Sequence, residues 1–164
     1  MKIRVVTKKD IEALHGEALC NIQLLEDALS HSITLKKDVK YLHKIPKEEA
    51  NSLLKKNRSH TLGKAIKIAK KESIYSDVLQ YELEAFLLER NWLVHKSMPE
   101  YLDEVCVSPG KTEFFDRIKG IANKAKLLQL TIEIDLIEFS ESVGLDMSKV
   151  SEIVALQIKS NMDS

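Results

Sequence analysis

The chain has 164 residues, and its 25 basic and 25 acidic side chains give a formal net charge of 0. This length predicts one domain, and an apolar fraction of 44% is enough for a sizeable core. A net charge of zero does not by itself point to a polyanionic partner. No apolar run approaches the ~18 residues that a membrane span needs, so we expect no membrane association. We also expect no signal peptide. Three prolines and five glycines are few for this length and favour helices.

The two cysteines, Cys20 and Cys106, are isolated and lack the CxxC spacing of metal or redox sites. Two such thiols are typical of a reducing compartment, so we expect a cytoplasmic protein, with a Cys20–Cys106 disulfide as the alternative. The five histidines are scattered, and the sequence has no glycine-rich phosphate loop and no zinc or di-iron pattern. We therefore expect no metal and no cofactor.

Charge is distributed unevenly along the chain. Residues 34–71 contain twelve Lys or Arg and three Asp or Glu, whereas residues 127–164 contain two Lys and seven acids. A local excess of positive charge is typical of a face that binds an anionic polymer, and an ordinary solvated helix surface is the alternative. The side chains from which we expect RNA contacts are Arg58, Lys64, Lys67 and Lys71.

The first predicted helix begins after Thr7, an N-cap residue whose capping box is completed by Asp10. Apolar residues then alternate by three and four positions for about six turns, which places them on one helix face. They are Ile11, Leu14, Ala18, Ile22, Leu25 and Leu29. The serines and threonine of residues 30–34 compete for backbone hydrogen bonds, so they predict a break or a new cap.

Three short helices are predicted next, and Thr61 caps the third, which is basic and amphipathic. Their ranges are 36–44, 46–56 and 61–71, with a turn at 57–60. A central helix then begins near Ser76 or Asp77 and stops before Pro99, because the residue preceding a proline resists helical geometry. Residues 98–110 are the longest predicted loop, and a mobile lid is one interpretation of it.

A second long helix is predicted to open at Thr112 or Lys111, and Gly144 closes it as a C′ residue. Within it, Leu127–Ile137 is apolar on more than one side, so it faces either the core or another subunit. A strand at residues 130–139 is the second interpretation of this pattern. Ser148 is predicted to cap a final helix, whose inward residues are Val150, Ile153, Val154 and Ile158. The sequence thus predicts a single all-α domain, an up-and-down bundle of four main helices with short basic helices inserted between the first two.

The residues with the strongest chemical potential are Arg90, Asn91 and His95, near the end of the central helix. Histidine transfers protons near neutral pH, and the planar guanidinium of arginine binds phosphoryl oxygens. Asn91 and His95 are four residues apart, so they share one side of the helix. Arg90 lies roughly 140° around the helix axis from His95. For the two side chains to act together, either the long Arg90 side chain or a helix break must close this angle, or a second chain must supply one of the two residues.

The pattern Arg90-Asn91-Trp92-Leu93-Val94-His95 resembles the motif of the HEPN superfamily. That superfamily consists of helical-bundle proteins, many of them metal-independent endoribonucleases of toxin–antitoxin, phage-defence and RNA-processing systems. The resemblance implies a homodimer, with Arg90 as phosphate clamp, Asn91 as orienting residue and His95 as proton-transfer residue. It covers six residues, and the predicted bundle over residues 1–164 agrees with it.

Two alternatives to a ribonuclease remain open at this stage. In the first, the chain is a non-catalytic helical interaction protein, such as an antitoxin, an immunity factor or an HEPN-like binding module, and its partner is another protein. In the second, residues 89–96 are an ordinary helix end, where His95 and Lys96 are cations that the helix dipole favours and Trp92 is a packing anchor.

Overall fold

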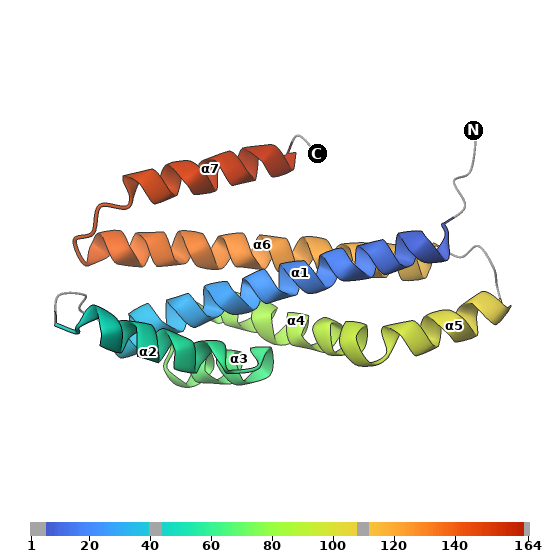
Figure 1. Cartoon of the computed structure of the whole chain (residues 1–164), viewed down its shortest axis with the longest axis horizontal. Helices are drawn as coiled ribbons and strands as arrows, with labels where there is room; N and C mark the ends of the chain where they lie inside the picture. The colour runs from blue at the N-terminus through green and yellow to red at the C-terminus, as the bar shows by residue number, and fades with distance from the viewer. Residues whose placement is uncertain (1–5, 40–43, 108–111, 163–164) are drawn as a thin grey trace.

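The computed structural model describes residues 6–39, 44–107 and 112–162, and every regular element within them is helical. The protein is an all-α helical bundle, as its sequence predicts (Figure 1). The elements are α1 (Lys8–Ile33), the π-helical η1 (Thr34–Val39), α2 (Lys47–Arg58), α3 (Leu62–Lys71), α4 (Asp77–His95), α5 (Ser97–Val107), α6 (Glu113–Ser142) and α7 (Ser148–Met162). Among these helices, none combines the length and the apolar character that crossing a membrane requires.

Four long helices alternate in direction along the chain, namely α1, α4, α6 and α7 (Figure 1). Helix α1 packs against α6 along most of its length, and α4 runs in the opposite direction to both. The basic helices α2 and α3 lie between α1 and α4 in the chain, where the sequence predicts them. Helix α7 folds back along the outside of α6.

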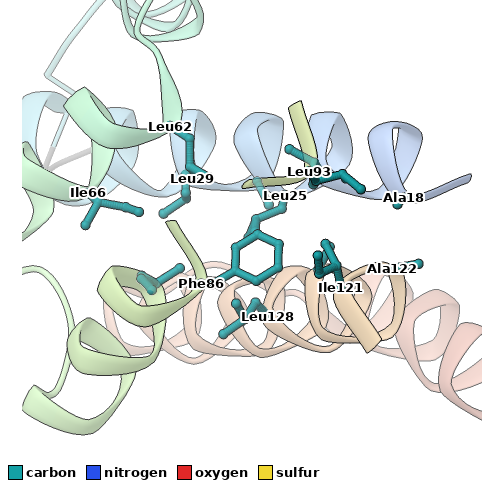
Figure 2. Close-up of a cluster of buried hydrophobic side chains, with 14 of the residues drawn as sticks. Ala18, Leu25, Leu29, Leu62, Ile66, Phe86, Leu93, Ile121, Ala122 and Leu128 are labelled. Carbon is teal, nitrogen blue, oxygen red and sulfur yellow. The ribbon is translucent and has the colours of Figure 1, made fainter. Parts of the chain in front are cut away.

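The core lies where α1, α4 and α6 meet. Figure 2 shows the ring of Phe86 from α4 between Leu25 of α1 and Leu128 of α6. These apolar side chains are almost fully removed from water, and burial of each contributes about 1.5–3 kcal/mol to folding. Leu93, in the last turn of α4, belongs to the same cluster, so the core holds the region of the candidate motif in place.

The caps predicted at Thr7, Thr61 and Ser76 are confirmed, whereas Ser148 lies inside α7 as its first residue rather than capping it. The Thr7 hydroxyl accepts the N–H of Asp10 at 3.2 Å, and the Asp10 carboxylate accepts the N–H of Thr7 at 2.8 Å, which completes a capping box. Thr61 accepts from the N–H of Lys64 to start α3, and Ser76 caps α4 in the same way.

At residues 30–34, where the sequence predicts a break or a new cap, α1 ends at Ile33, but the chain continues directly as the π-helical η1 because the hydroxyl groups bond to the preceding helical turn. Ser30 donates to the carbonyl of Glu26 at 2.8 Å, and Thr34 donates to the carbonyl of Ser30 at 2.7 Å. Such bonds to the i−4 carbonyl let Ser and Thr stay inside a helix. The chain then continues as η1 to Val39. Of the rest of the helix predicted at 36–44, residues 40–43 lie outside the described part and residue 44 is not helical.

The turn predicted at residues 57–60 is shorter than expected, because Asn57 and Arg58 belong to α2. Asn57 is buried, and its amide donates to the Thr34 hydroxyl and to the Asp38 carboxylate, both at 2.8 Å. This buried bonding extends α2 by two residues beyond the predicted end at Lys56.

The loop predicted at residues 98–110 is wrong over most of its length, since α5 occupies Ser97–Val107. Helix α4 does end before Pro99, at His95, but Met98 and Pro99 are themselves helical in the first turn of α5, where a missing N–H costs nothing. Residues 108–110 of the predicted lid lie outside the description. The Cys20–Cys106 alternative involves a side chain that is likewise outside it, while Cys20 is an exposed free thiol.

Helix α6 confirms the helical interpretation of Leu127–Ile137 over the strand. Its inner residues Leu128 and Ile132 are fully buried, whereas Leu127 and Ile134 are 56% and 39% exposed. The second apolar side therefore faces outward in the single chain.

Gly144 ends α6 with a φ of 92°, as predicted for a C′ residue. Of the inward residues predicted on α7, Val154 is buried, but Val150 and Ile153 are 41% and 57% exposed. The reason is that α7 rests mainly on α6, so one narrow row of its side chains is covered. Ser148 is the first residue of α7, and the Asp146 carboxylate accepts its N–H.

Candidate functional site

The candidate motif lies at the carboxyl end of α4, which neighbouring side chains hold firmly. The carbonyl of Leu93 accepts a bond from the buried Ser97 hydroxyl, and His15 Nε2 lies 3.2 Å from the same carbonyl and 3.0 Å from the Ser97 Oγ. A carbonyl only accepts, so Nε2 is the protonated nitrogen of His15. These bonds satisfy the end of α4 and fix where the chain turns into α5.

Arg90 faces inward. It continues the buried row of α4 formed by Leu79, Leu83 and Phe86, with spacings of three and four residues. Its Nη2 lies 3.6 Å from Oε1 of Glu26 on α1, and the two side chains are 23% and 29% exposed. The guanidinium is therefore held between α1 and α4.

The ion pair of Arg90 with Glu26 is loose. A separation of 3.6 Å exceeds a hydrogen bond. Arg90 Nε and Glu26 Oε1 are buried, and neither has a hydrogen-bond partner among the described residues. Unsatisfied buried polar atoms cost free energy, so Arg90 retains capacity for a better acceptor.

Asn91 and His95 face outward, and both side chains are exposed. Arg90 Nη1 donates to Asn91 Oδ1 at 3.3 Å, which links the inward and outward parts of the motif. Between Arg90 and His95 themselves, the described side chains make no hydrogen bond, in agreement with their displacement of roughly 140° around the helix. One chain thus brings Arg90 and Asn91 together and leaves His95 apart.

His95 belongs to a row of exposed side chains along α4. Val78, Tyr81 and Leu88 are 73%, 73% and 71% exposed, and Ala85 lies between them in the three-four spacing of one helix face. Continuing this spacing leads through Trp92 to His95. We call the row Val78, Tyr81, Ala85, Leu88 and His95 the outer stripe.

Trp92 interrupts the exposed row because other helices cover it. Its ring is 5.5 Å from the Phe114 ring, the Arg117 guanidinium lies 3.6 Å from the ring centroid, and its Nε1 donates to Glu100 at 2.7 Å. Trp92 is thus a packing anchor between α4, α5 and α6, as its place in an apolar run predicts.

A groove of about 420 Å³ between α4 and α6 runs beside the outer stripe. Its floor is apolar, and the small residues Ala85 and Gly120 leave it open. Two ion pairs bridge its rim: Glu89 with Arg117 at 3.0 Å, and Glu82 with Lys124 at 3.2 Å. Sequence reasoning missed this groove, because it depends on how closely two helices approach.

Three of the four residues predicted to bind RNA share one exposed face. Lys64, Lys67 and Lys71 lie outward on α3, and none forms an ion pair within the described part of the chain. Arg58 instead donates to Asp27 at 2.7 Å, and this bond raises the pKa of Arg58. Arg58 is therefore already paired with an acid.

Helix α3 leads toward the motif. It runs antiparallel to α4, since Gln80 donates to the carbonyl of Ile66 while Gly63 approaches Leu87. The amino end of α3 thus lies beside Leu87, near the middle of α4 and one turn before Arg90, and its lysines extend away from that end.

Comparisons with protein-family models, with curated proteins and with solved structures find no match for this chain.

Proposed function

We propose that this protein is a homodimeric, HEPN-like endoribonuclease that cleaves RNA without a metal ion. The observation that supports this most is the position of His95 in the outer stripe. Exposed apolar side chains at helical spacing are typical of a surface that another helix covers. A second copy that covers this stripe at its Leu88–His95 end brings two His95 side chains into one interface.

The chemistry needs two proton transfers. One His95 removes the proton from a ribose 2′-hydroxyl, whose oxygen forms a bond to the adjacent phosphorus. The bond from phosphorus to the 5′-oxygen of the next nucleotide breaks, and the His95 of the second copy gives that oxygen a proton. The products are a 2′,3′-cyclic phosphate and a free 5′-hydroxyl.

Arg90 stabilises the charge that develops on the phosphate. Its loose contact with Glu26 leaves Nε unsatisfied, and a phosphoryl oxygen is a better acceptor for the guanidinium fork. Asn91, which accepts a bond from Arg90, orients that fork at the surface. The exposed face of Lys64, Lys67 and Lys71 guides the RNA toward this end of α4.

The proposal is tested by RNA cleavage in the presence of EDTA. We expect wild-type protein to produce cyclic phosphate ends and His95→Ala to be slower by about 10²–10⁴-fold, since it removes a proton-transfer group. Arg90→Lys keeps a positive charge opposite Glu26 but loses the planar fork, so it is also slow. Because His95 is exposed, His95→Ala is expected to keep the wild-type melting temperature.

Lys96→Ala is the matched control, because Lys96 is the next exposed cation at the same helix end. It is expected to cleave within about twofold of wild type. The ribonuclease proposal fails if wild-type protein leaves single-stranded and structured RNAs intact, or if His95→Ala cleaves them as fast as wild type.

A second candidate function is that of a non-catalytic helical interaction protein. The observation that favours it is the inward position of Arg90, which is already paired with Glu26. In that case the groove between α4 and α6 receives an apolar helix of another protein. A stable one-to-one complex with such a protein, together with no cleavage and no RNA binding at low salt, distinguishes it from the first candidate.

A further inference from the structure

A second basic feature lies where η1, α2 and α3 meet. The buried Asn57 amide bonds to Thr34 and Asp38 and so holds η1 against α2. The N–H of His60 donates to the carbonyl of Asn57 at 3.0 Å, which places His60 at the same junction, directly before the cap of α3. We call the side chains Lys37, Lys56, His60 and Lys64 the His60 corner.

The His60 corner gathers positive charge from three elements. Lys37 comes from η1, Lys56 from α2 and Lys64 from α3. Burial lowers the pKa of His60, and the charges of Lys64, Lys56 and Lys37 lower it further, whereas Asp38 acts in the opposite sense. These lysines are therefore near enough to the imidazole to oppose its protonation.

Acids at the corner do not balance this charge. Asp38 is the acid that acts on His60, and it already accepts from Asn57 and, at 3.1 Å, from Lys37. Within the described part of the chain, Lys56 and Lys64 form no ion pair. Three ammonium groups against one carboxylate leave a local excess that attracts an anion.

His60 also has unused bonding capacity. Its Nδ1 is buried and has no hydrogen-bond partner among the residues the structure describes. A buried ring nitrogen without a partner costs free energy, which an acceptor or donor brought by a ligand relieves. The first turn of α3, beside this ring, contains no acidic residue that would repel an anion.

We infer that the His60 corner is a phosphate-binding site, in which Lys37, Lys56 and Lys64 hold one phosphate group beside His60. This inference rests on the proposed function only for the source of the phosphate, which is RNA. Since the amino end of α3 lies beside Leu87, one turn before Arg90 on α4, a phosphate held there anchors the strand on the side of Arg90. The shared chemistry is a backbone phosphodiester or a terminal phosphate.

The test follows the His60 ring protons by NMR while inorganic phosphate is added at constant ionic strength, with the signal assigned from a His60→Gln variant. We expect a saturable shift and a rise in the pKa of His60. Lys56→Gln weakens phosphate binding by about threefold or more. Lys55→Gln is the matched control, because Lys55 is exposed on the same helix but does not act on His60, and it leaves binding unchanged. The proposed phosphate site is overturned if the shift of the His60 signal does not saturate with phosphate, or if Lys56→Gln and Lys55→Gln bind phosphate equally well.

The source of the phosphate is tested with one RNA sequence carrying either a 5′-phosphate or a 5′-hydroxyl, added to the His95→Ala variant. Competition by both RNAs assigns a backbone phosphodiester, and competition by the phosphorylated RNA alone assigns a terminal phosphate. If neither displaces inorganic phosphate, the assignment to RNA is overturned. If the protein cleaves RNA but the His60 signal does not change with phosphate, only the phosphate site at the His60 corner is refuted. If the signal responds to phosphate but the protein cleaves no RNA, only the ribonuclease proposal is refuted.

Discussion

At the scale of single residues, Lys36 and Asp135 join η1 to α6 through an ion pair. The Lys36 side chain is 12% exposed, and its ammonium group lies 5.3 Å from the Tyr75 ring centroid and 5.6 Å from that of Phe139. A charge in such surroundings needs its partner, because burial penalises an unpaired ion.

Asp135→Asn is therefore expected to lower the free energy of unfolding by about 2 kcal/mol, less than the ~3–5 kcal/mol of a fully buried pair because Asp135 is one-third exposed. Urea denaturation measures this difference in the free energy of unfolding. Glu138→Gln, an exposed change on the same helix, is expected to stay within about 0.5 kcal/mol of wild type. Equal stabilities of the two variants would contradict this role of the ion pair.

Because of His60, the free energy of unfolding is expected to fall as the pH is lowered. Its pKa in the folded protein is lowered by burial and by the lysines at positions 64, 56 and 37, against the weaker effect of Asp38. As the pH falls below about 6.5, the unfolded chain takes up this proton first, so stability is full above that pH and declines below it. His60→Gln should lose less stability than wild type between about pH 7.5 and 5.5. Parallel stability curves, measured by thermal unfolding, would refute this.

The residues of the site were only partly predictable from sequence. Helical spacing predicts that Asn91 and His95 share a face and that Arg90 does not, because those relations depend on one helix alone. The partners Glu26 and His15 come from α1, and no local pattern shows which residues of two helices will meet. That relation depends on packing.

At the scale of elements, caps and apolar periodicity predict most of the helices. Thr7, Thr61 and Ser76 start helices where expected, since a side-chain cap is a local interaction. The errors occur where one residue type allows two structures. Thr34 favours a helix break but bonds back to the preceding turn, and Pro99 favours a loop but lies in the first turn of α5.

Gly144 controls the connection between α6 and α7. Its φ of 92° accompanies bonds from the Gly144 N–H to the Glu141 carbonyl and from the Leu145 N–H to the Ser140 carbonyl, a Schellman motif. An added Cβ meets nothing within 4 Å, so Gly144→Ala costs backbone strain alone, about 1 kcal/mol.

Gly16 is the matched control for this change, because an added Cβ also meets open space there, but the backbone is helical. Gly16→Ala is expected to raise the free energy of unfolding by about 0.5–1 kcal/mol. Thermal unfolding of both variants measures the difference, and a stabilising Gly144→Ala would contradict the conformational argument.

At the scale of the whole molecule, the outer stripe and the adjacent groove predict self-association. The same face offers projecting side chains, such as Tyr81 and Leu88, and a hollow beside them with a rim of two acids and two bases. A twofold interface needs both features on one patch, and the balanced rim avoids repulsion between like charges.

Sedimentation equilibrium is therefore expected to give wild-type protein a mass near twice 18.7 kDa. Leu88→Asp places a charge in the stripe and should produce monomers, because an unpaired buried charge is strongly unfavourable at an interface. Leu156→Asp is the control, since Leu156 is 68% exposed on α7, away from the stripe. Equal dissociation of both variants, or a wild-type monomer at high concentration, would refute an α4 interface.

The most direct test of a site completed by two copies is the rate of RNA cleavage per mole of protein, measured in EDTA against protein concentration. The proposed dimer predicts that this specific rate rises through the dissociation constant of the dimer and then levels off. It also predicts that Leu88→Asp requires far higher concentrations than Leu156→Asp. A specific rate that stays constant down to concentrations at which the protein is monomeric, or no cleavage at any concentration, would contradict the account.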